Sequence, residues 1–226
     1  MRQLVIGLGE AGGPLREIIG CDGWDSREAP DRECPRGSDV LHVAFPYRAD
    51  FVEYVKWYQA RQTKDCLVII HSTVPIGTTA KLANAVHSPI QGQHHNMKEA
   101  LLKIPKWVGG MRAPEAAGIL GQAGFTCRVF PAPEHTEALK LICLAKYGVD
   151  IAMAKLAREI GNDVGLSQDA IRYWDLNYNQ HVPPRLRRAL IDPQPGPIGG
   201  HCVVPGVRLL DQSHPRDILK GVLAYG

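Results

Sequence analysis

The sequence predicts an α/β fold, in which a doubly wound parallel sheet is followed by a long helix and a small helical C-terminal part. Two observations lead to this prediction. Short apolar runs alternate with helical patterns in the first half of the chain, which is typical of strands covered by helices. Residues 134–162 then form a proline-free segment that is apolar almost all round, which is typical of a buried helix.

Composition narrows the class of protein. The chain has 226 residues, of which 45% are apolar and 22% charged, so it can build a core. The net charge of +3 comes without a basic stripe, which argues against a nucleic-acid partner. No run approaches the roughly 18 apolar residues of a membrane span, and the N-terminus lacks a signal-peptide pattern. Six cysteines without a C-x-x-C pair indicate buried thiols in a reduced, cytoplasmic protein.

The elements of the first half follow in order. Strands are expected at residues 4–6, 23–25, 39–45, 66–70, 107–110 and 125–130. Helices are expected at residues 14–19, 78–86, 98–104 and 114–121, and a further helix starts at Asp50. Asp50 is its expected N-cap, with Glu53 as capping-box partner. The expected inner face of this helix carries Phe51, Tyr54, Val55 and Tyr58. Six strands in this rhythm favour a doubly wound sheet.

The second half is predicted to be helical. The long helix spans residues 134–162, and shorter helices are expected at 167–178 and 217–223. Residues 192–206 form a Gly/Pro loop. Because the long helix is apolar on several sides, we expect a second copy of the chain to cover it in a homodimer. The alternative is that the helices after Ser167 fold back over it.

A glycine pattern follows the first strand. Gly7-Leu8-Gly9-Glu10-Ala11-Gly12 is G-x-G-x-x-G at the opening of a helix. Such glycines let the backbone approach a pyrophosphate, whose charge lies at the helix N-terminus. This predicts a Rossmann-like dinucleotide-binding domain at residues 1–132, with Gly7, Gly9, Glu10, Ala11 and Gly12 at the cofactor and residues 133–226 as a helical dimerisation and substrate part. The alternative is a glycine-rich turn without a ligand.

An acid that binds the cofactor's ribose is expected about 20 residues further on. Asp25 lies 18 residues after Gly7, and Asp22 is its rival. An acid here repels a 2′-phosphate and favours NAD, whereas the nearby Arg27 leaves NADP open. A plain surface aspartate is the other interpretation.

Two hydroxyl residues follow the fourth strand. Ser72 and Thr73 are expected to face the ligand crevice at the carboxyl edge of the sheet, where they would bond ribose or substrate. The alternative is that they cap the helix expected at residue 78.

These motifs together resemble a known family. Ser72-Thr73-Val74-Pro75-x-Gly77-Thr78-Thr79, Glu137-Ala138-x-x-Lys140 and Gly199-Gly200-His201-Cys202 occur in the order seen in the UDP-glucose/GDP-mannose dehydrogenase family. Its members oxidise a nucleotide-sugar alcohol twice with NAD. The resemblance implies that Cys202 adds to the aldehyde intermediate and that Lys140 stabilises oxyanions.

The chain also departs from that family. Gly206 stands where the family has a carboxylate, Leu144 where it has an asparagine, and Ile90 where it has a glutamate. The sequence ends about 24 residues after Cys202, so we expect a short, divergent member without the family's C-terminal nucleotide-sugar-binding domain. Thioester hydrolysis and the usual mode of UDP-sugar binding are therefore not expected.

Other polar residues stand near the missing acids. His94 follows the Ser88-Pro89-Ile90 segment, together with His95, and is a candidate general base. A solvated histidine pair is the alternative, and we expect no metal, since adjacent histidines rarely bind one ion together. Cys202 has the alternative of an inert buried thiol, and Lys140 that of a simple ion pair with Glu137.

The function expected from these residues is an NAD-dependent oxidoreductase that acts on a small hydroxylated or sugar-like substrate. Cys202 and Lys140 are expected to lie close together near the nicotinamide end of the crevice. A dinucleotide-binding protein without redox activity is one alternative. A non-redox enzyme such as a transferase, with Cys202 as nucleophile, is another.

Overall fold

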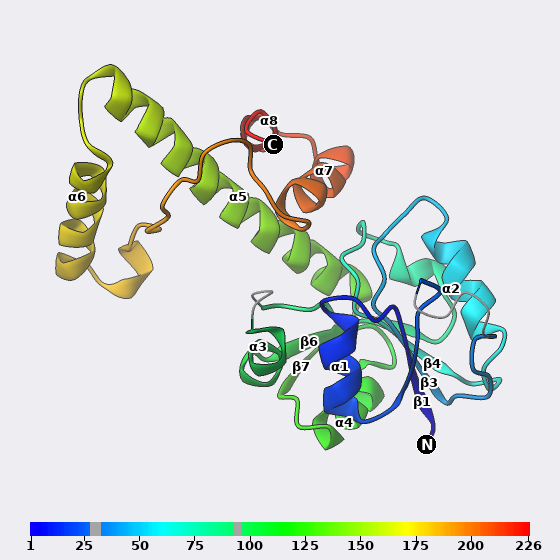
Figure 1. Cartoon of the computed structure of the whole chain (residues 1–226). Helices are drawn as coiled ribbons and strands as arrows, with labels where there is room; N and C mark the ends of the chain where they lie inside the picture. The colour runs from blue at the N-terminus through cyan, green and yellow to red at the C-terminus, as the bar shows by residue number, and fades with distance from the viewer. Residues whose placement is uncertain (28–32, 93–95) are drawn as a thin grey trace. The chain divides into compact units, whose positions relative to one another are not determined.

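The computed structural model describes residues 1–27, 33–92 and 96–226 (Figure 1). These residues form two compact units, Met1–Lys140 and Leu141–Gly226, and each unit is described by itself. The helix α5 (Pro133–Asp163) belongs in part to both units. In the described part of the chain, no helix combines the length and the apolar character needed to cross a membrane.

The first unit is built on one sheet with the strand order β2-β1-β3-β4-β5-β6-β7. The strands are β1 (Gln3–Ile6), β2 (Asp22–Trp24), β3 (Val40–Val43), β4 (Leu67–Ile70), β5 (Ala85–His87), β6 (Lys106–Gly109) and β7 (Cys127–Phe130). Strands β1 to β5 pair in parallel, as do β6 and β7, whereas β5 and β6 meet through one antiparallel pair. The chain reverses its winding direction between β1 and β3, which confirms the doubly wound, Rossmann-like sheet.

Helices cover both faces of the sheet (Figure 1). Helices α1 (Gly12–Ile19), α3 (Met97–Lys103) and α4 (Ala113–Gln122) contribute to one buried cluster, and α2 (Phe51–Gln59) contributes to the other. The side chains of β4 alternate between the two clusters. Leu67 and Ile69 belong to the first cluster, and Val68 and Ile70 belong to the second. The carboxyl ends of the central strands are thereby held rigidly for a site.

The segment after β4 differs from the prediction. A helix was expected at residues 78–86, but the structure has one short 3-10 turn, η1 (Thr79–Lys81), followed by β5. Leu82 is already extended, and Asn84 has a φ of 50°, so the backbone leaves the helical region before a full turn is made. The sheet consequently has seven strands, one more than predicted.

The expected capping box of α2 is wrong. Asp50 does hold the N-cap position, but its side chain makes no hydrogen bond to the helix. Its carboxylate instead accepts a hydrogen bond from Nη2 of Arg48 at 2.9 Å. An ion pair with a cationic neighbour two residues away competes with the backbone N–H groups for the same oxygens.

A group of four polar side chains, His42, His71, His87 and Lys106, is buried in or directly beside the strands. Nδ1 of His42 lies 3.0 Å from Nε2 of His71, and Nδ1 of His71 lies 2.9 Å from the carbonyl oxygen of Ser88. Since that carbonyl only accepts, His71 donates from Nδ1 and His42 donates to His71. Burial lowers the pKa of His42 to about 3, and His87, which contacts Thr136, behaves in the same way. The fourth, Lys106, donates to the carbonyls of Ser88 and Pro89, and burial lowers its pKa to about 7.

The second unit is helical. It contains the later turns of α5, then α6 (Gln168–His181), the 3-10 turn η3 (Pro184–Leu186), α7 (Val203–Ser213) and α8 (Asp217–Leu223). The Gly/Pro loop expected to run to residue 206 ends at Cys202, because α7 starts at Val203 with Pro205 in its first turn, where a helix tolerates proline. Gly148 of α5 lies so close to α8 that an added Cβ would be 2.8 Å from Val222.

Candidate functional site

The three glycines of the first loop have three different roles. Gly7 has a φ of 88°, and a Cβ there would lie 2.8 Å from the backbone nitrogen of Phe45. At Gly12 a Cβ would lie 1.8 Å from the carbonyl oxygen of Gly7, so only glycine fits. At Gly9, by contrast, the nearest described atom to an added Cβ, apart from its neighbours in sequence, is Nη2 of Arg27 at 3.6 Å. The described residues therefore leave room for a side chain at position 9, and that this space admits a ligand's pyrophosphate stays a prediction of the glycine pattern.

The remaining loop residues open helix α1. Ala11 is its N-cap residue and packs against the core, while Glu10 is exposed. The backbone nitrogen of Gly13 already donates to the carbonyl oxygen of Gly9 at 2.9 Å, which closes the turn. The loop thus presents the N-terminal end of an eight-residue helix at the carboxyl edge of β1.

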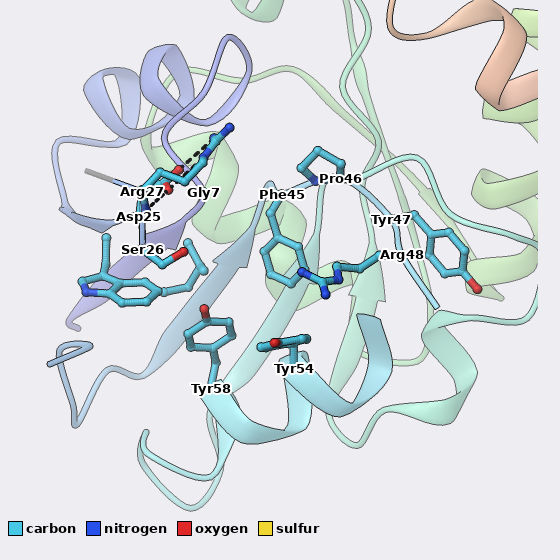
Figure 2. Close-up of a pocket in the computed structure, with 12 residues that line it drawn as sticks. Gly7, Asp25, Ser26, Arg27, Phe45, Pro46, Tyr47, Arg48, Tyr54 and Tyr58 are labelled. Atoms are coloured by element: carbon cyan, nitrogen blue, oxygen red, sulfur yellow. Dashed lines mark hydrogen bonds and ion pairs between the residues drawn. The ribbon is translucent and has the colours of Figure 1, made fainter. Parts of the chain in front are cut away.

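A pocket of about 380 Å³ lies beside this loop, at the reversal point between β1 and β3 (Figure 2). Its lining is formed by Ile6, Gly7, Trp24, Asp25, Ser26, Arg27, Phe45, Pro46, Tyr47, Arg48, Tyr54 and Tyr58. Figure 2 shows Asp25, Ser26 and Arg27 on one side and Arg48 on the other, with Tyr54 and Tyr58 of α2 along the floor. The guanidinium carbon of Arg48 lies 5.0 Å from the ring centroid of Tyr54. Several aromatic rings beside a glycine loop suit a flat, polar ring system such as adenine.

Asp25 is the residue predicted to bind ribose, and it lines this pocket but is only 5% exposed. Its Oδ2 accepts from the backbone nitrogen of Leu8 at 2.9 Å and from Nη2 of Arg27 at 3.2 Å. Its Oδ1 accepts from the backbone nitrogen and from Nε of Arg27, at 2.9 and 3.2 Å. The hydrogen bonds from Arg27, aided by the bond from Leu8, lower the pKa of Asp25 to about 2. Its rival Asp22 is exposed and pairs with Arg2.

Ser72 connects the loop after β4 to the pocket through a hydrogen bond. Its hydroxyl donates to the carbonyl oxygen of Phe45 at 2.6 Å, and Phe45 packs against Gly7 and lines the pocket. Thr73 follows in the same loop and is half-buried. The loop predicted to face the crevice therefore does lie at the carboxyl edge of the sheet, joined to the glycine loop through Phe45.

Glu137 fixes the far end of that loop. Its carboxylate accepts from the backbone nitrogens of Gly77 at 2.6 Å and of Thr79 at 2.8 Å. The side chain is fully buried, and burial raises its pKa. Lys140, one turn later on α5, donates from Nζ to the carbonyl oxygen of Ile90 at 2.8 Å. Each side chain thus binds backbone groups of the loops at the sheet edge, and the simple Glu137–Lys140 ion pair considered for the sequence stays the alternative.

Cys202 belongs to the second unit. It is half-buried at the N-cap position of α7, and its carbonyl oxygen accepts from the backbone nitrogen of Gly206 at 2.9 Å. A Cβ at Gly206 would lie 2.5 Å from Cδ1 of Leu144. The two positions at which the resembling family carries a carboxylate and an asparagine are therefore in direct apolar contact here. The predicted proximity of Cys202 to Lys140, which belongs to the first unit, stays a prediction.

His94 and His95 lie outside the described residues. Among the residues that the structure describes, no three or more His, Cys, Asp or Glu side chains are grouped so as to hold a metal ion.

The fold has clear counterparts among solved structures. UDP-D-ManNAc dehydrogenase from Pyrococcus horikoshii aligns over 100% of this chain and 68% of its own, with a TM-score of 0.83 and 19% identity. In fold, the chain resembles the UDP-sugar dehydrogenases. A 3-hydroxyisobutyrate dehydrogenase from Mycobacterium tuberculosis aligns over 99% of this chain and 92% of its own, with a TM-score of 0.73 and 15% identity. Psf3, solved with NADP⁺ and 2-OPP, aligns over 98% of this chain and 92% of its own, with a TM-score of 0.66 and 19% identity.

Sequence comparison adds nothing to these likenesses, because no family model and no curated protein matches the chain. The resemblance that the motifs predicted is confirmed at the level of the fold.

Two parts of the site were not predicted from the sequence. One is the aromatic and basic wall formed by residues 45–48, where Phe45 and Arg48 line the pocket. The Phe45-Pro46-Tyr47-Arg48 run directly after the third strand was an available signal, since that position flanks the reversal point. The other is the pair of hydrogen bonds from Gly77 and Thr79 to Glu137, because the motif that contains Glu137 does not reveal which backbone groups its carboxylate binds.

Proposed function

We propose that the protein is a nicotinamide-dinucleotide-dependent oxidoreductase that acts on a small hydroxylated or sugar-like substrate. The observation that carries the proposal is Gly9, where the protein leaves open the space that a Cβ would fill while Gly7 and Gly12 are held by the protein itself. The solved neighbours are dehydrogenases by name, which supports the same reaction class.

The residues of the first unit fit a dinucleotide. The glycine loop and the N-terminus of α1 would hold the pyrophosphate, and the pocket lined by Trp24, Phe45 and Tyr58 would hold the adenosine. The nicotinamide, which supplies hydride transfer when bound, would then extend along the sheet edge toward residues 71–79. Ser72 and Thr73 belong to that loop, and Glu137 holds its far end by accepting hydrogen bonds from Gly77 and Thr79.

The substrate end is assigned to Lys140 and Cys202. Lys140 is anchored at Ile90, at the same edge of the sheet, and its charge would stabilise an oxyanion on the substrate. Cys202 stands at the start of an 11-residue helix, where negative charge on a thiolate or an adduct is favoured. His94 remains a candidate general base, and a homodimer remains the proposed assembly.

A second candidate function is a dinucleotide-binding protein without redox activity. The contact between Leu144 and Gly206 favours it, because an apolar side chain fills the position at which the resembling family has polar groups. Such a protein would keep the affinity for the cofactor and lack turnover.

The test combines binding and turnover. Calorimetric titration of the full chain with NAD and NADP should give binding that is lost in Gly9→Val, since a branched side chain would occupy the pyrophosphate space. The thermal unfolding midpoint should stay near that of the wild type, because in the described part of the chain, apart from the neighbours of Gly9 in sequence, only the end of Arg27 lies within 4 Å of the added Cβ. Equal affinity in wild type and Gly9→Val would refute the site.

Turnover is followed by absorbance in the reduced-nicotinamide band with a panel of sugar alcohols and hydroxy acids. Reduction of the cofactor that is lost in Cys202→Ala and Lys140→Met supports the oxidoreductase. Binding without reduction of the cofactor by any substrate supports the second candidate.

A further inference from the structure

The acceptor sites of Asp25 are all taken by the protein itself. A carboxylate offers about four lone-pair sites, and here the Leu8 backbone and three nitrogens of Arg27 supply four donors within 3.2 Å. A ribose that carries free 2′- and 3′-hydroxyls needs an acceptor on this side of the pocket. Asp25 can serve as that acceptor only if one of its four bonds is broken.

The outward-facing group at this position is a cation. The side chain of Arg27 is 74% exposed, although its guanidinium is fastened to Asp25. Its Nη2 lies 3.6 Å from the place of a Cβ on Gly9, so the guanidinium reaches the edge of the pyrophosphate loop. Ser26, which lines the same side, adds a hydroxyl (Figure 2). An arginine held in one orientation by a carboxylate suits a phosphate, because less side-chain freedom is lost on binding.

The charge of Asp25 does not oppose a phosphate here. It is matched by Arg27 at hydrogen-bond distance, and it is buried behind that side chain. On the opposite wall, Arg48 is likewise matched by Asp50. Among the residues that the structure describes here, both carboxylates are thus paired with an arginine, and Arg27 and Ser26 are exposed on this side of the pocket.

We propose that the pocket selects NADP over NAD, with Arg27 and Ser26 binding the 2′-phosphate and Asp25 serving to orient Arg27. This rests on the proposed function, because it presumes that the glycine loop binds a dinucleotide. Under this assignment Asp25 is a positioning residue and does not touch the ribose. Arg27 sets the specificity.

The test compares the affinities of NADP and NAD for the full chain by calorimetry at fixed ionic strength. The wild type should bind NADP at least tenfold more tightly. Arg27→Gln should weaken NADP binding by roughly 10- to 100-fold, the usual range for a lost charge-assisted hydrogen bond. The same change should leave NAD affinity equal or higher, since it releases acceptor sites on Asp25. Arg27→Lys, which keeps the charge, should retain part of the preference.

Arg36→Gln is the matched control, because Arg36 is 64% exposed and pairs with Glu33 at the surface. It should leave both affinities unchanged, and thermal unfolding shows whether Arg27→Gln is folded. Tighter binding of NAD than of NADP by the wild type overturns the inference and leaves the proposed function standing. An equal loss of both affinities in a folded Arg27→Gln also overturns it. Binding of neither dinucleotide refutes the proposed function itself.

Discussion

At the residue scale, the first loop needs glycine at Gly7 and Gly12, where an added Cβ would lie less than 3 Å from backbone atoms. Gly12 is the extreme case, because any side chain there would overlap the carbonyl oxygen of Gly7. This requirement comes from the protein itself, so we expect a change at Gly12 to act on stability and a change at Gly9 to act on the proposed binding of the cofactor.

Gly12→Ala is predicted to destabilise the fold by about 3 kcal/mol, since overpacking forces the backbone of the loop to move. Gly118→Ala is the control, and its expected effect on the free energy of unfolding has the opposite sign. Gly118 lies on the exposed side of α4, and a Cβ there has no neighbour within 4 Å. Alanine in a helix interior should stabilise by about 0.5–1 kcal/mol. Urea unfolding of both variants checks the pair, and a neutral Gly12→Ala would contradict the loop geometry.

The sequence predicts part of the site at this scale. The glycines and Asp25 follow from a fixed spacing, which local backbone geometry dictates. The partners of Asp25 and Glu137 do not follow, because each carboxylate binds donors that the chain brings to it only after folding. Lys106 is a similar case, since a lysine in a strand is expected to be exposed but here lies against two backbone carbonyls.

At the element scale, α5 carries an apolar stripe that the chain leaves exposed. Ile142, Met153 and Ile160 are 46%, 56% and 53% exposed. With Val149 and Leu156, they follow spacings of 7, 4, 3 and 4 residues, which keeps all five on one face. Met153 also lines a cavity of about 490 Å³ beside α6. Such a stripe is typical of a helix that pairs with another helix.

We predict that this stripe forms the homodimer contact. Burying one of these side chains in the contact stabilises the dimer by roughly 1.5–3 kcal/mol. Met153→Glu would remove the contribution of Met153. Light scattering at micromolar concentration should give a dimer for the wild type and a monomer for Met153→Glu. Tyr147→Glu is the control, because Tyr147 is 52% exposed but lies about 140° round the helix from Ile142. A monomeric wild type would show that the stripe is not an interface.

Prediction at this scale succeeded for most elements and failed where the local composition favours a different structure. The long helix and most strands were found, but β5 has only three residues and follows a stretch whose composition suits a helix. Helix α7 was missed because its first turn holds Pro205 and Gly206. In both cases tertiary contacts outweigh local propensity.

At the scale of the whole molecule, buried neutral histidines make stability depend on pH. Burial lowers the pKa values of His42 and His87 to about 3 and that of His71 well below its usual range. In the unfolded chain these side chains titrate near pH 6.5. The unfolded state therefore binds more protons below that pH, and the stability present above pH 6.5 is lost as the pH falls toward the folded pKa values.

The unfolding free energy is predicted to fall between pH 6.5 and 5, by up to about 1.4 kcal/mol per pH unit for each histidine once the unfolded state is protonated. Glu137, whose pKa is raised, acts with the opposite sign near its own titration. Lys106 acts only between pH 7 and about 10.5, where stability should rise with pH. Urea unfolding monitored by circular dichroism measures the slope. His87→Gln should reduce it and the exposed His214→Gln should not, while a flat profile would contradict the buried, neutral state.

The hydrogen bond between His42 and His71 also provides a nuclear magnetic resonance signal that reports on the fold. A ring proton that is shared between two buried imidazoles exchanges with water only when the sheet opens, so it reports on the central strands alone. In a nitrogen-15 labelled sample its resonance should stand apart from the backbone amides. Because His71 directly precedes Ser72, whose hydroxyl bonds Phe45 at the pocket, that single resonance should also shift when a dinucleotide enters.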